Sequence, residues 1–492
     1  MSGILSLLLP MLLPIVMGTI LLFLKPMKER KPVLIFTGAV LILTGVLVCS
    51  ALTSPEETYV LFYLTETIPI VLKLDLLGKF FLAVVSVVWI LAGFFSFSYM
   101  KHEKNEKRYF GFYLITYGVL VGLGCSGNLV TMYAFYEFMT IASFPMVIHN
   151  QSREAIMAGL KYLFYSFFGA YMALFGLFFL CRYTNTITFT LGGTLNMELV
   201  SGHEGLILLV ACLMLMGFGV KAGMFPLHAW LPTAHPVAPA PASAALSGII
   251  VKGGVLAILR VIFYLIGPDF LRGSWVQYVM LTLSLVTVFM GSMLAFRENV
   301  LKKRLAYSTV SQLSYILFGI ALLNPVGLTG SMLHIAAHAL IKCTLFLCAG
   351  AIIFRTGITT VDGLRGIGKK MPVTIWCFTI VSLGLIGIPP TSGFISKWYL
   401  ATGALDSGIA VYRYVGPVIL LISALLTAGY LLPVTIKGFF PGDDFDYTSL
   451  KNCEGDGFMK VPLIILTILS VVIGMFPQPL LNMISSIING LF

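Results

Sequence analysis

The sequence predicts an all-α polytopic membrane protein with about fourteen transmembrane helices. Of its 492 residues, 58% are hydrophobic and only 10% are charged. Apolar runs of roughly 20 residues recur from end to end, and each is long enough to cross the hydrocarbon core of a bilayer. Basic residues gather in alternate loops, as they do in proteins that insert with their positive loops inside.

Short polar loops divide the chain into apolar segments. The first segment lacks a basic leader and a small-residue cleavage site, so we expect it to be retained as a span. The stretch Tyr59–Leu74 is too rich in Thr, Glu and Pro for a span, and we expect a short surface hairpin there. We predict helices at residues 2–24, 33–52, 76–100, 109–126, 128–149, 154–181, 205–231, 242–265, 275–296, 303–323, 328–353, 373–402, 414–438 and 460–490.

Loop charge predicts the orientation. Four basic residues fall in the loops on one side, and twenty fall on the other. An odd number of spans would destroy this alternation, so both termini are predicted on the outer side of a cell (inner) membrane. The same distribution argues against nucleic-acid binding, despite the net charge of +11. The twenty residues are Lys25, Lys28, Arg30, Lys31, Lys101, Lys104, Lys107, Arg108, Arg153, Arg297, Lys302, Lys303, Arg304, Arg355, Arg365, Lys369, Lys370, Lys437, Lys451 and Lys460.

The eight cysteines form no clustered set. Iron–sulfur ligation needs about four thiolates on one cluster, so none is expected here. No group of residues suggests a nucleotide, flavin or metal site. We therefore expect no cofactor and no redox centre in this chain, and any electron transfer would belong to partner subunits.

Seven Lys and Arg residues remain inside the predicted helices: Lys79, Lys161, Lys221, Lys252, Arg260, Lys342 and Lys397. Each costs about 2.5–3.5 kcal/mol at a helix centre. Lys79 and Arg260 lie near helix ends, where snorkelling to the surface explains them. The other five need another explanation.

Further ionisable groups accompany these lysines. Glu137 adds a carboxylate near mid-span, and the four-residue spacing of His334, His338 and Lys342 places them on one helix face. Desolvation lowers the pKa of a lysine and a nearby carboxylate raises it, so lysine suits a proton relay. Static ion pairs between helices are the alternative. The number of groups, spread over six helices, favours a pathway for protons or cations.

Two helices are predicted to be broken. One contains Gly223 and Pro226, and the other contains Gly387, Pro389 and Pro390. Glycine and proline at membrane depth free backbone groups that must be satisfied by protein or water, so such breaks line cavities.

Each break has a lysine nearby, since Lys221 precedes Pro226 by five residues and Lys397 follows Pro390 by seven. Paired breaks predict two inverted five-helix repeats, at residues 109–265 and 275–438. Residues 1–108 would add three helices before the repeats, and residues 460–492 a final one.

The motifs around these lysines resemble those of the antiporter-like subunits of respiratory complex I. The same fold serves multisubunit cation/proton antiporters and the membrane arms of energy-converting hydrogenases and formate hydrogenlyases. The matching stretches run from Lys221 to His235, Gly248 to Lys252, Lys302 to Gln312, His334 to Lys342 and Pro389 to Lys397.

The resemblance implies a fourteen-helix proton-translocating subunit. It implies that Glu137 pairs with Lys221 in a first half-channel, that Lys252 is central, and that Lys397 ends the outward half-channel. The sequence departs from the family pattern at two places. Val300 stands where the family often has Asp, and Tyr430-Leu-Leu-Pro433 is more typical of the hydrogenase-linked branch. The expected pathway comprises Glu137, Lys161, Lys221, His228, Lys252, His334, His338, Lys342 and Lys397.

The predicted function is proton translocation within a redox-driven complex that is complex I-like or hydrogenase-like. Expected partners are other membrane-arm subunits, a peripheral redox module and the lipid bilayer. A sodium/proton antiporter subunit is one alternative. Glu137 is the only clear mid-span carboxylate, which disfavours a dedicated sodium cage, because sodium prefers several oxygen ligands. A structural subunit without a pathway is the other alternative.

Overall fold

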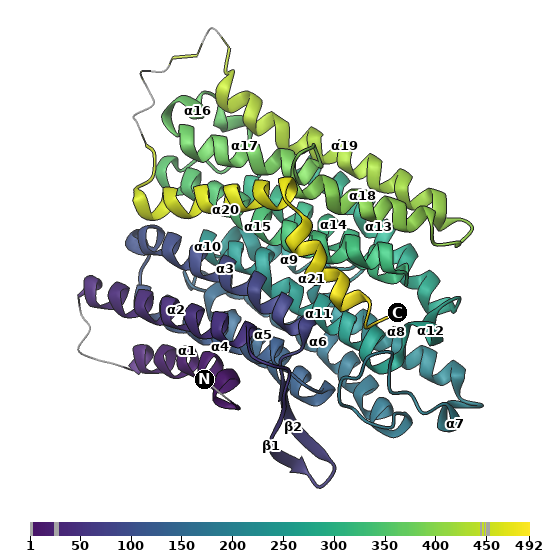
Figure 1. The fold of residues 1–492 in the computed structure, drawn as a ribbon. Coiled ribbons are helices and arrows are strands. Elements are labelled where there is room, and N and C mark those ends of the chain that lie inside the picture. The colour runs from purple at the N-terminus through teal and green to yellow at the C-terminus, as the bar shows by residue number, and fades with distance from the viewer. Residues whose placement is uncertain (1–2, 24–28, 443–444, 447, 449–452) are drawn as a thin grey trace.

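The computed structural model describes residues 3–23, 29–442, 445–446, 448 and 453–492. Lys25, Lys28 and Lys451, which the sequence places on the basic side, lie outside these residues. The described chain is mostly helical, with one β-hairpin (Figure 1).

The N-terminal part contains a hairpin between its second and third long helices. Its elements are α1 (Leu5–Phe23), α2 (Arg30–Leu52), β1 (Thr58–Thr65), β2 (Ile68–Lys73), α3 (Leu76–Tyr99), η1 (Met100–His102), α4 (Glu106–Gly124), α5 (Leu129–Val147) and α6 (Arg153–Tyr183). The strands β1 and β2 pair antiparallel, with Thr58 opposite Lys73. The predicted hairpin is confirmed.

The middle part combines one broken helix with one continuous helix that has two π-helical segments, η2 and η3. The elements are α7 (Met197–Val200), α8 (Glu204–Lys221), α9 (Leu231–Val237), α10 (Ala240–Ala245), η2 (Leu246–Ile250), α11 (Val251–Arg260), η3 (Val261–Ile266) and α12 (Pro268–Leu271).

The C-terminal part has a second broken helix. The elements are α13 (Trp275–Arg297), α14 (Leu301–Ala321), α15 (Pro325–Thr356), η4 (Asp362–Leu364), α16 (Ile367–Lys370), α17 (Pro372–Ile386), α18 (Ser392–Leu405), α19 (Tyr412–Phe439), α20 (Gly457–Met475) and α21 (Gln478–Ile488).

Ten helical segments of the described chain are long and apolar enough to cross a membrane. Two of them form the centre of the bundle, because all of the apolar window of Ala240–Ile266 and 89% of that of Pro325–Thr356 are buried. Only 33% of the window in α19 is buried, so much of its apolar surface faces outward. Apolar outer faces are what lipid requires. The chain is thus a polytopic membrane protein.

The two ends of the bundle differ. One end, which we call the hairpin face, carries residues 54–75, 184–196 and 486–491; Glu56, Leu191 and Ile487 line one cavity there. Gly3, near the N-terminal end of the described chain, lies beside Tyr59 on the same face. The opposite end, which we call the basic face, carries residues 100–108, 148–153, 236–239, 297–303 and 353–370.

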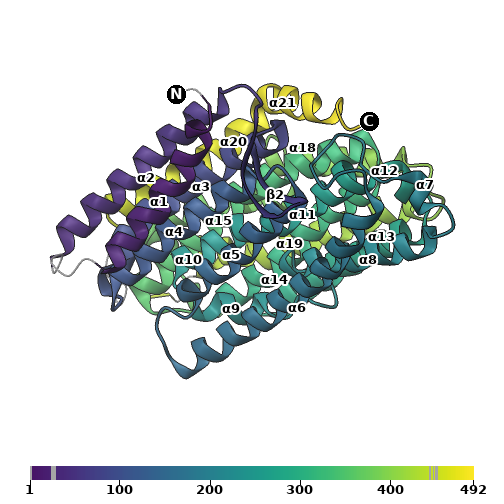
Figure 2. The same cartoon turned by 90° about the horizontal axis from the view of Figure 1, so that it is seen from below.

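The last predicted helix is wrong in part. We expected one helix over residues 460–490, but α20 ends at Met475 and α21 begins at Gln478. Pro477 lies between them and has no backbone N–H to continue the helix. The separate helix α21 lies across the hairpin face (Figure 2).

Arg260 is buried and does not snorkel, contrary to expectation. It is 2% exposed, and both ends of its guanidinium bond the carboxylate of Asp75, Nη2 to Oδ1 at 2.7 Å. Asp75 also caps α3 by accepting from the backbone N–H of Gly78 at 2.9 Å. The pair therefore ties the start of α3 to the end of α11.

Candidate functional site

The first break places a lysine in a cage of hydroxyl groups. Helix α8 ends at Lys221 because Gly223 adopts a left-handed φ of +72° that other residues rarely take. Lys221 is fully buried, and its Nζ donates to Thr140 Oγ1 at 2.7 Å, to Tyr162 OH at 3.1 Å and to Ser166 Oγ at 3.1 Å.

Glu137 lies on α5, one turn before Thr140, but it does not touch Lys221. Among the ion pairs of the described residues none includes Glu137, and its buried Oε1 has no hydrogen-bond partner. The charges of Glu137 and Lys221 still interact across the intervening space. The expected direct pair is therefore replaced by a longer-range interaction.

Lys161 and His228 flank the same break. Lys161, on α6, donates to Thr233 Oγ1 of α9 at 3.1 Å. The ring of His228 stacks on that of Phe225, with centroids 6.0 Å apart, and its buried Nδ1 has no partner. Both side chains are only partly buried, so they lie between the lysine cage and the surface.

The centre of the bundle joins Lys252 to His338. Nζ of Lys252 lies 2.7 Å from Nδ1 of His338 on α15, and it also donates to the carbonyl of Ser247 at 2.9 Å. Ser247 belongs to η2, where the π-helical pattern interrupts the ordinary ladder of backbone bonds. The structure thus brings together two predicted residues from different helices.

The predicted stripe on α15 is continuous and fully enclosed. His334, His338 and Lys342 are each at most 1% exposed. Nδ1 of His334 contacts Ser396 Oγ at 2.8 Å, and its Nε2 contacts Gln312 Oε1 at 3.1 Å. Lys342 donates to the carbonyl of Leu305 at 3.0 Å.

The second break holds Lys397. Helix α17 ends at Ile386 because Gly387 has a φ of +95°. Nζ of Lys397 donates to the carbonyls of Leu385 at 2.6 Å and Ile386 at 2.9 Å. These carbonyls carry the negative end of the helix dipole and suit a cation. Nζ also lies 5.0 Å from the ring centroid of Tyr315.

Tyr315 lies between His334 of α15 and Lys397 of α18. Its ring stacks on that of His334 at 5.5 Å while it lies under Lys397, and Ser396 is the residue before Lys397 in the chain. Lys252, His338, His334 and Lys397 therefore form a chain of neighbouring groups.

At the Lys221 end of the bundle, Gly254 of α11 packs against α8 so closely that an added Cβ would lie 3.0 Å from Cβ of Lys221.

None of the ion pairs among the described residues involves Lys221, Lys252, Lys342 or Lys397. Each ammonium group is instead hydrogen-bonded to hydroxyls, carbonyls or an imidazole. These four lysines therefore do not form the static salt bridges of the alternative hypothesis. Buried cations without carboxylate partners are expensive and mark functional sites.

The sequence motifs do not reveal the hydroxyl and amide partners, which are Thr140, Tyr162, Ser166, Gln312 and Ser396. Tyr162 and Ser396 are direct neighbours of Lys161 and Lys397 in the chain, which is a signal that could have found them. Lys302 was assigned to a basic loop, but it is only 7% exposed and lies in the first turn of α14. Among the described residues no three His, Cys, Asp or Glu side chains are grouped to hold a metal ion.

Comparison with known protein families gives two matches. A family model described as NADH:quinone oxidoreductase/Mrp antiporter, TM, matches residues 126–427. A second, described as NADH-Ubiquinone oxidoreductase (complex I), chain 5 N-terminus, matches residues 64–110. All nine predicted pathway residues fall within the first match.

Individual relatives come from several kinds of complex. The chain is 30% identical to NADH-quinone oxidoreductase subunit N of Desulforudis audaxviator over 395 residues, which is 77% of this chain and 76% of that protein. It is 28% identical to a Na(+)/H(+) antiporter subunit of Bacillus subtilis, over 95% of this chain and 93% of the relative. It is 34% identical to hydrogenase-4 component B of Escherichia coli, over 68% of this chain and 51% of that protein.

Solved structures share the fold. A chain of the Mrp complex from Dietzia sp. superposes with a TM-score of 0.86 at 21% identity, covering 99% of this chain and 98% of its own. A chain of respiratory complex I from Thermus thermophilus gives a TM-score of 0.82 at 22% identity, covering 99% and 100%. With a family match over residues 126–427, well over half of its length, the chain belongs to the NADH:quinone oxidoreductase/Mrp antiporter transmembrane family.

Proposed function

We propose that this chain is a proton-translocating membrane subunit of a redox-driven ion-pumping complex. One observation carries the proposal. Lys221, Lys252, Lys342 and Lys397 are held at the centre of the bundle by neutral hydrogen-bond partners, so each can release a proton without breaking an ion pair. A scaffold has no need for such costly groups.

The proposed architecture has fourteen spans with two inverted repeats at residues 109–265 and 275–438. The breaks after Lys221 and after Ile386 support it, because each falls in the fourth helix of its five-helix unit. An odd number of helices reverses the orientation of the second unit, as inverted repeats require. Residues 1–108 and 460–492 flank the two units.

The basic face is proposed to be cytoplasmic, with both termini on the outer side of the cell membrane. The excess of Lys and Arg in the loops of that face supports this orientation. Gly3 and Ile487, near the two ends of the described chain, both line cavities at the hairpin face, which supports the same side for both termini.

Protons are proposed to move laterally through the chain of neighbouring groups. Glu137, Lys161, Lys221 and His228 form the first half-channel at the first break. Lys252, His338, His334 and Lys342 form the central axis, and Lys397 ends the outward half-channel. The bond from Lys252 to His338 supports transfer, because it joins two groups that can each carry the proton.

The proposed coupling between a neighbouring subunit and proton release in this chain is electrostatic. A charge change in a neighbouring subunit would act on Glu137, which is only half-buried, and through it on Lys221. At an effective dielectric of ~20, two charges 4 Å apart interact by about 4 kcal/mol. Moving one proton against 100 mV requires about 2.3 kcal/mol. At that dielectric, the interaction of two charges equals the work of moving one proton up to a separation of roughly 7 Å.

The proposed partners are other membrane-arm subunits and a peripheral redox module that carries the electron chemistry. Helix α6 supports lateral assembly, because large side chains at helical spacing project from it. Phe164, Tyr171 and Phe178 are each between 66% and 68% exposed. Rings of this size suit packing against lipid or another subunit.

The test uses membrane vesicles of the host, driven by the complex's own electron donor and read by quenching of a pH-sensitive dye. Lys221→Ala and Lys252→Ala should each abolish proton uptake while the subunit still co-purifies. Lys303→Ala is the control, because Lys303 is exposed and pairs with Glu298 at 2.8 Å. Full pumping by both buried-lysine variants would contradict the proposal.

A sodium/proton antiporter subunit is the second candidate. The similarity to the antiporter protein of Bacillus subtilis extends over 95% of this chain, which favours keeping it. Sodium-free vesicles separate the two functions. A redox-driven proton pump retains its activity there, whereas an antiporter acidifies or alkalinises the vesicle only when sodium is added.

A further inference from the structure

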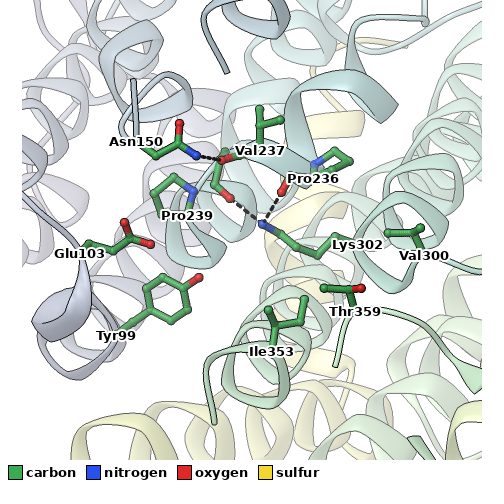
Figure 3. Close-up of a pocket in the computed structure, with 11 residues that line it drawn as sticks. Tyr99, Glu103, Asn150, Pro236, Val237, Pro239, Val300, Lys302, Ile353 and Thr359 are labelled. Atoms are coloured by element: carbon green, nitrogen blue, oxygen red, sulfur yellow. Dashed lines mark hydrogen bonds between the residues drawn. The ribbon is translucent and has the colours of Figure 1, made fainter. Parts of the chain in front are cut away.

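The basic face carries a cavity of about 350 Å³ that reaches into the bundle beside Lys302 (Figure 3). Tyr99 and Glu103 line one side of it, and the loop between α9 and α10 lines another. Lys302 is only 7% exposed and points its ammonium group at that loop. The cavity therefore ends at a buried cation.

The loop binds Lys302 through backbone carbonyls alone. Nζ of Lys302 donates to the carbonyl of Ala238 at 2.5 Å and to that of Pro236 at 3.2 Å. Pro236 lies in the last turn of α9 and Ala238 is its C-cap, where carbonyls have no partner within the helix; the carbonyl of Ala238 also accepts from Ser243 Oγ at 3.5 Å. No ion pair of the described residues includes Lys302.

Glu103 is the acidic group of the cavity, and it lies beyond the end of α3. Burial raises the pKa of Glu103, and the positive charge of Lys302 opposes part of that rise. The carboxylate therefore acts on Lys302 through charge across the cavity. A partly buried carboxyl at the mouth attracts protons from the surrounding water.

A fully buried histidine lies in the last turn of α9, just before the loop. His235 is 0% exposed, and neither of its ring nitrogens has a hydrogen-bond partner. Its ring stacks on Phe346 of α15 with centroids 4.6 Å apart, which holds its orientation. Phe346 lies one helical turn after Lys342 on α15, and the positive charges of Lys302 and Lys342 both act on the ring. An unpaired polar group in such a place is costly unless it has a role.

We infer that this cavity is the proton inlet of the basic face, with Lys302 and His235 linking the water outside to Lys342 on the central axis. The inference rests on the proposed function and adds two residues to its pathway. An N–H bond of the Lys302 ammonium breaks as one forms on His235. Once Lys342 has passed its own proton along the central axis, the imidazolium gives the proton on its opposite nitrogen to the Lys342 amine, and a hydronium ion that enters through the water of the cavity reprotonates Lys302.

Substitutions at Lys302 separate a relay from an anchor. Lys302→Arg keeps the charge and the bonds to the loop, but arginine does not release its proton. Lys302→Met removes the charge and keeps the length. We expect both to lower the initial pumping rate about 100-fold or more, within the range for losing a proton-transfer group. Lys303→Met, at the neighbouring exposed position, should stay within about twofold of the parent.

Labelling after assembly tests the cavity without relying on a variant that must fold with a changed interior. Thr359 lines the cavity, and Thr359→Cys is made in a chain whose accessible native cysteines are replaced. A bulky, membrane-impermeant maleimide added from the basic face should block pumping. The same label on Lys101→Cys, which is exposed on that face outside the cavity, should not.

The outcomes distinguish the two proposals when Lys221→Ala is measured alongside. Loss of pumping in Lys221→Ala, Lys302→Arg and labelled Thr359→Cys supports the inlet. Loss only in Lys221→Ala leaves the proposed function standing and overturns the inlet. Normal pumping by Lys221→Ala overturns the proposed function itself, and the inlet with it.

Discussion

Nζ of Lys252 lies 2.7 Å from Nδ1 of His338, and both side chains are buried. Because the ammonium donates, Nδ1 of His338 accepts and its proton lies on Nε2, which has no hydrogen-bond partner. One proton moving along this bond changes the charged residue from lysine to histidine. We therefore propose that this pair passes a proton between α11 and α15.

The first prediction follows from this pair. His338→Phe keeps a ring in the same place but removes the acceptor, so proton transfer should fall about 100-fold or more, as is usual when a proton-transfer group is lost. Dye quenching in host vesicles measures it. His149→Phe is the control, because His149 is a buried histidine on the basic face whose ring contacts only the backbone of Lys104 by hydrogen bond. Equal pumping in the two variants would contradict this proton transfer.

The second prediction concerns the hydroxyl cage of Lys221. Thr140→Val preserves shape and removes a hydrogen bond to an ammonium group, which is worth about 1.5–3 kcal/mol. We expect pumping to slow by roughly 10- to 100-fold. Thr116→Val is the matched control, since Thr116 is equally buried but bonds only the carbonyl of Phe112 in its own helix. A similar loss in both variants would assign the effect to packing.

The third prediction concerns the contact between α8 and α11. In Gly254→Ala the new Cβ would lie 2.6 Å from the carbonyl oxygen of Phe218, so backbone must shift near Lys221. Overpacking of this kind costs about 1–3 kcal/mol, and we expect reduced pumping with a lower melting temperature. Gly253→Ala meets side-chain ends, those of Met139 at 2.7 Å and Leu123 at 3.1 Å, and no backbone atom among its nearest contacts, so it should be milder. The reverse order of severity would show that this contact does not position Lys221.

The fourth prediction concerns the ion pair of Arg260 and Asp75. Arg260→Met leaves a buried carboxylate without its partner, which costs about 3–5 kcal/mol. Thermal unfolding of the purified complex should shift to lower temperature, and adding Asp75→Asn should restore part of the loss. Arg272→Met should have no measurable effect, because its pair with Asp269 is exposed. If the double variant is no more stable than Arg260→Met, the pair is not the source of the effect.

The sequence predicts the position of a residue along a helix better than its partner on another helix. The spacing of His334, His338 and Lys342 is enough to place them on one face, and all three are buried there. The breaks also follow from local chemistry, because glycine and proline act on their own backbone. The partners could not be predicted, since Lys252 and His338 are 86 residues apart in the chain.

The charge of a residue does not predict its exposure where another part of the chain folds over it. Lys302 and its neighbour Lys303 look alike in a basic loop, but the loop before α10 covers only Lys302. For Glu137 and Lys221, charge suggests a contact that the structure does not contain. Opposite charges at mid-span suggest contact, yet Thr140, Tyr162 and Ser166 already bind the ammonium group. Hydroxyl groups are easily overlooked because they are common in helices.

The π-helical segment η2 makes this part of the chain intolerant of length changes. Leu246–Ile250 carries Ser247, whose carbonyl binds Lys252, and Lys252 follows directly after it. Removing one residue from the segment would convert the wide π turn into an α-helical turn and move the carbonyl of Ser247 away from Lys252. Lys252 would then lose one of the two partners that hold it beside His338. Natural variation in this stretch should therefore proceed by substitution, whereas an exposed loop such as residues 405–411 can gain or lose residues.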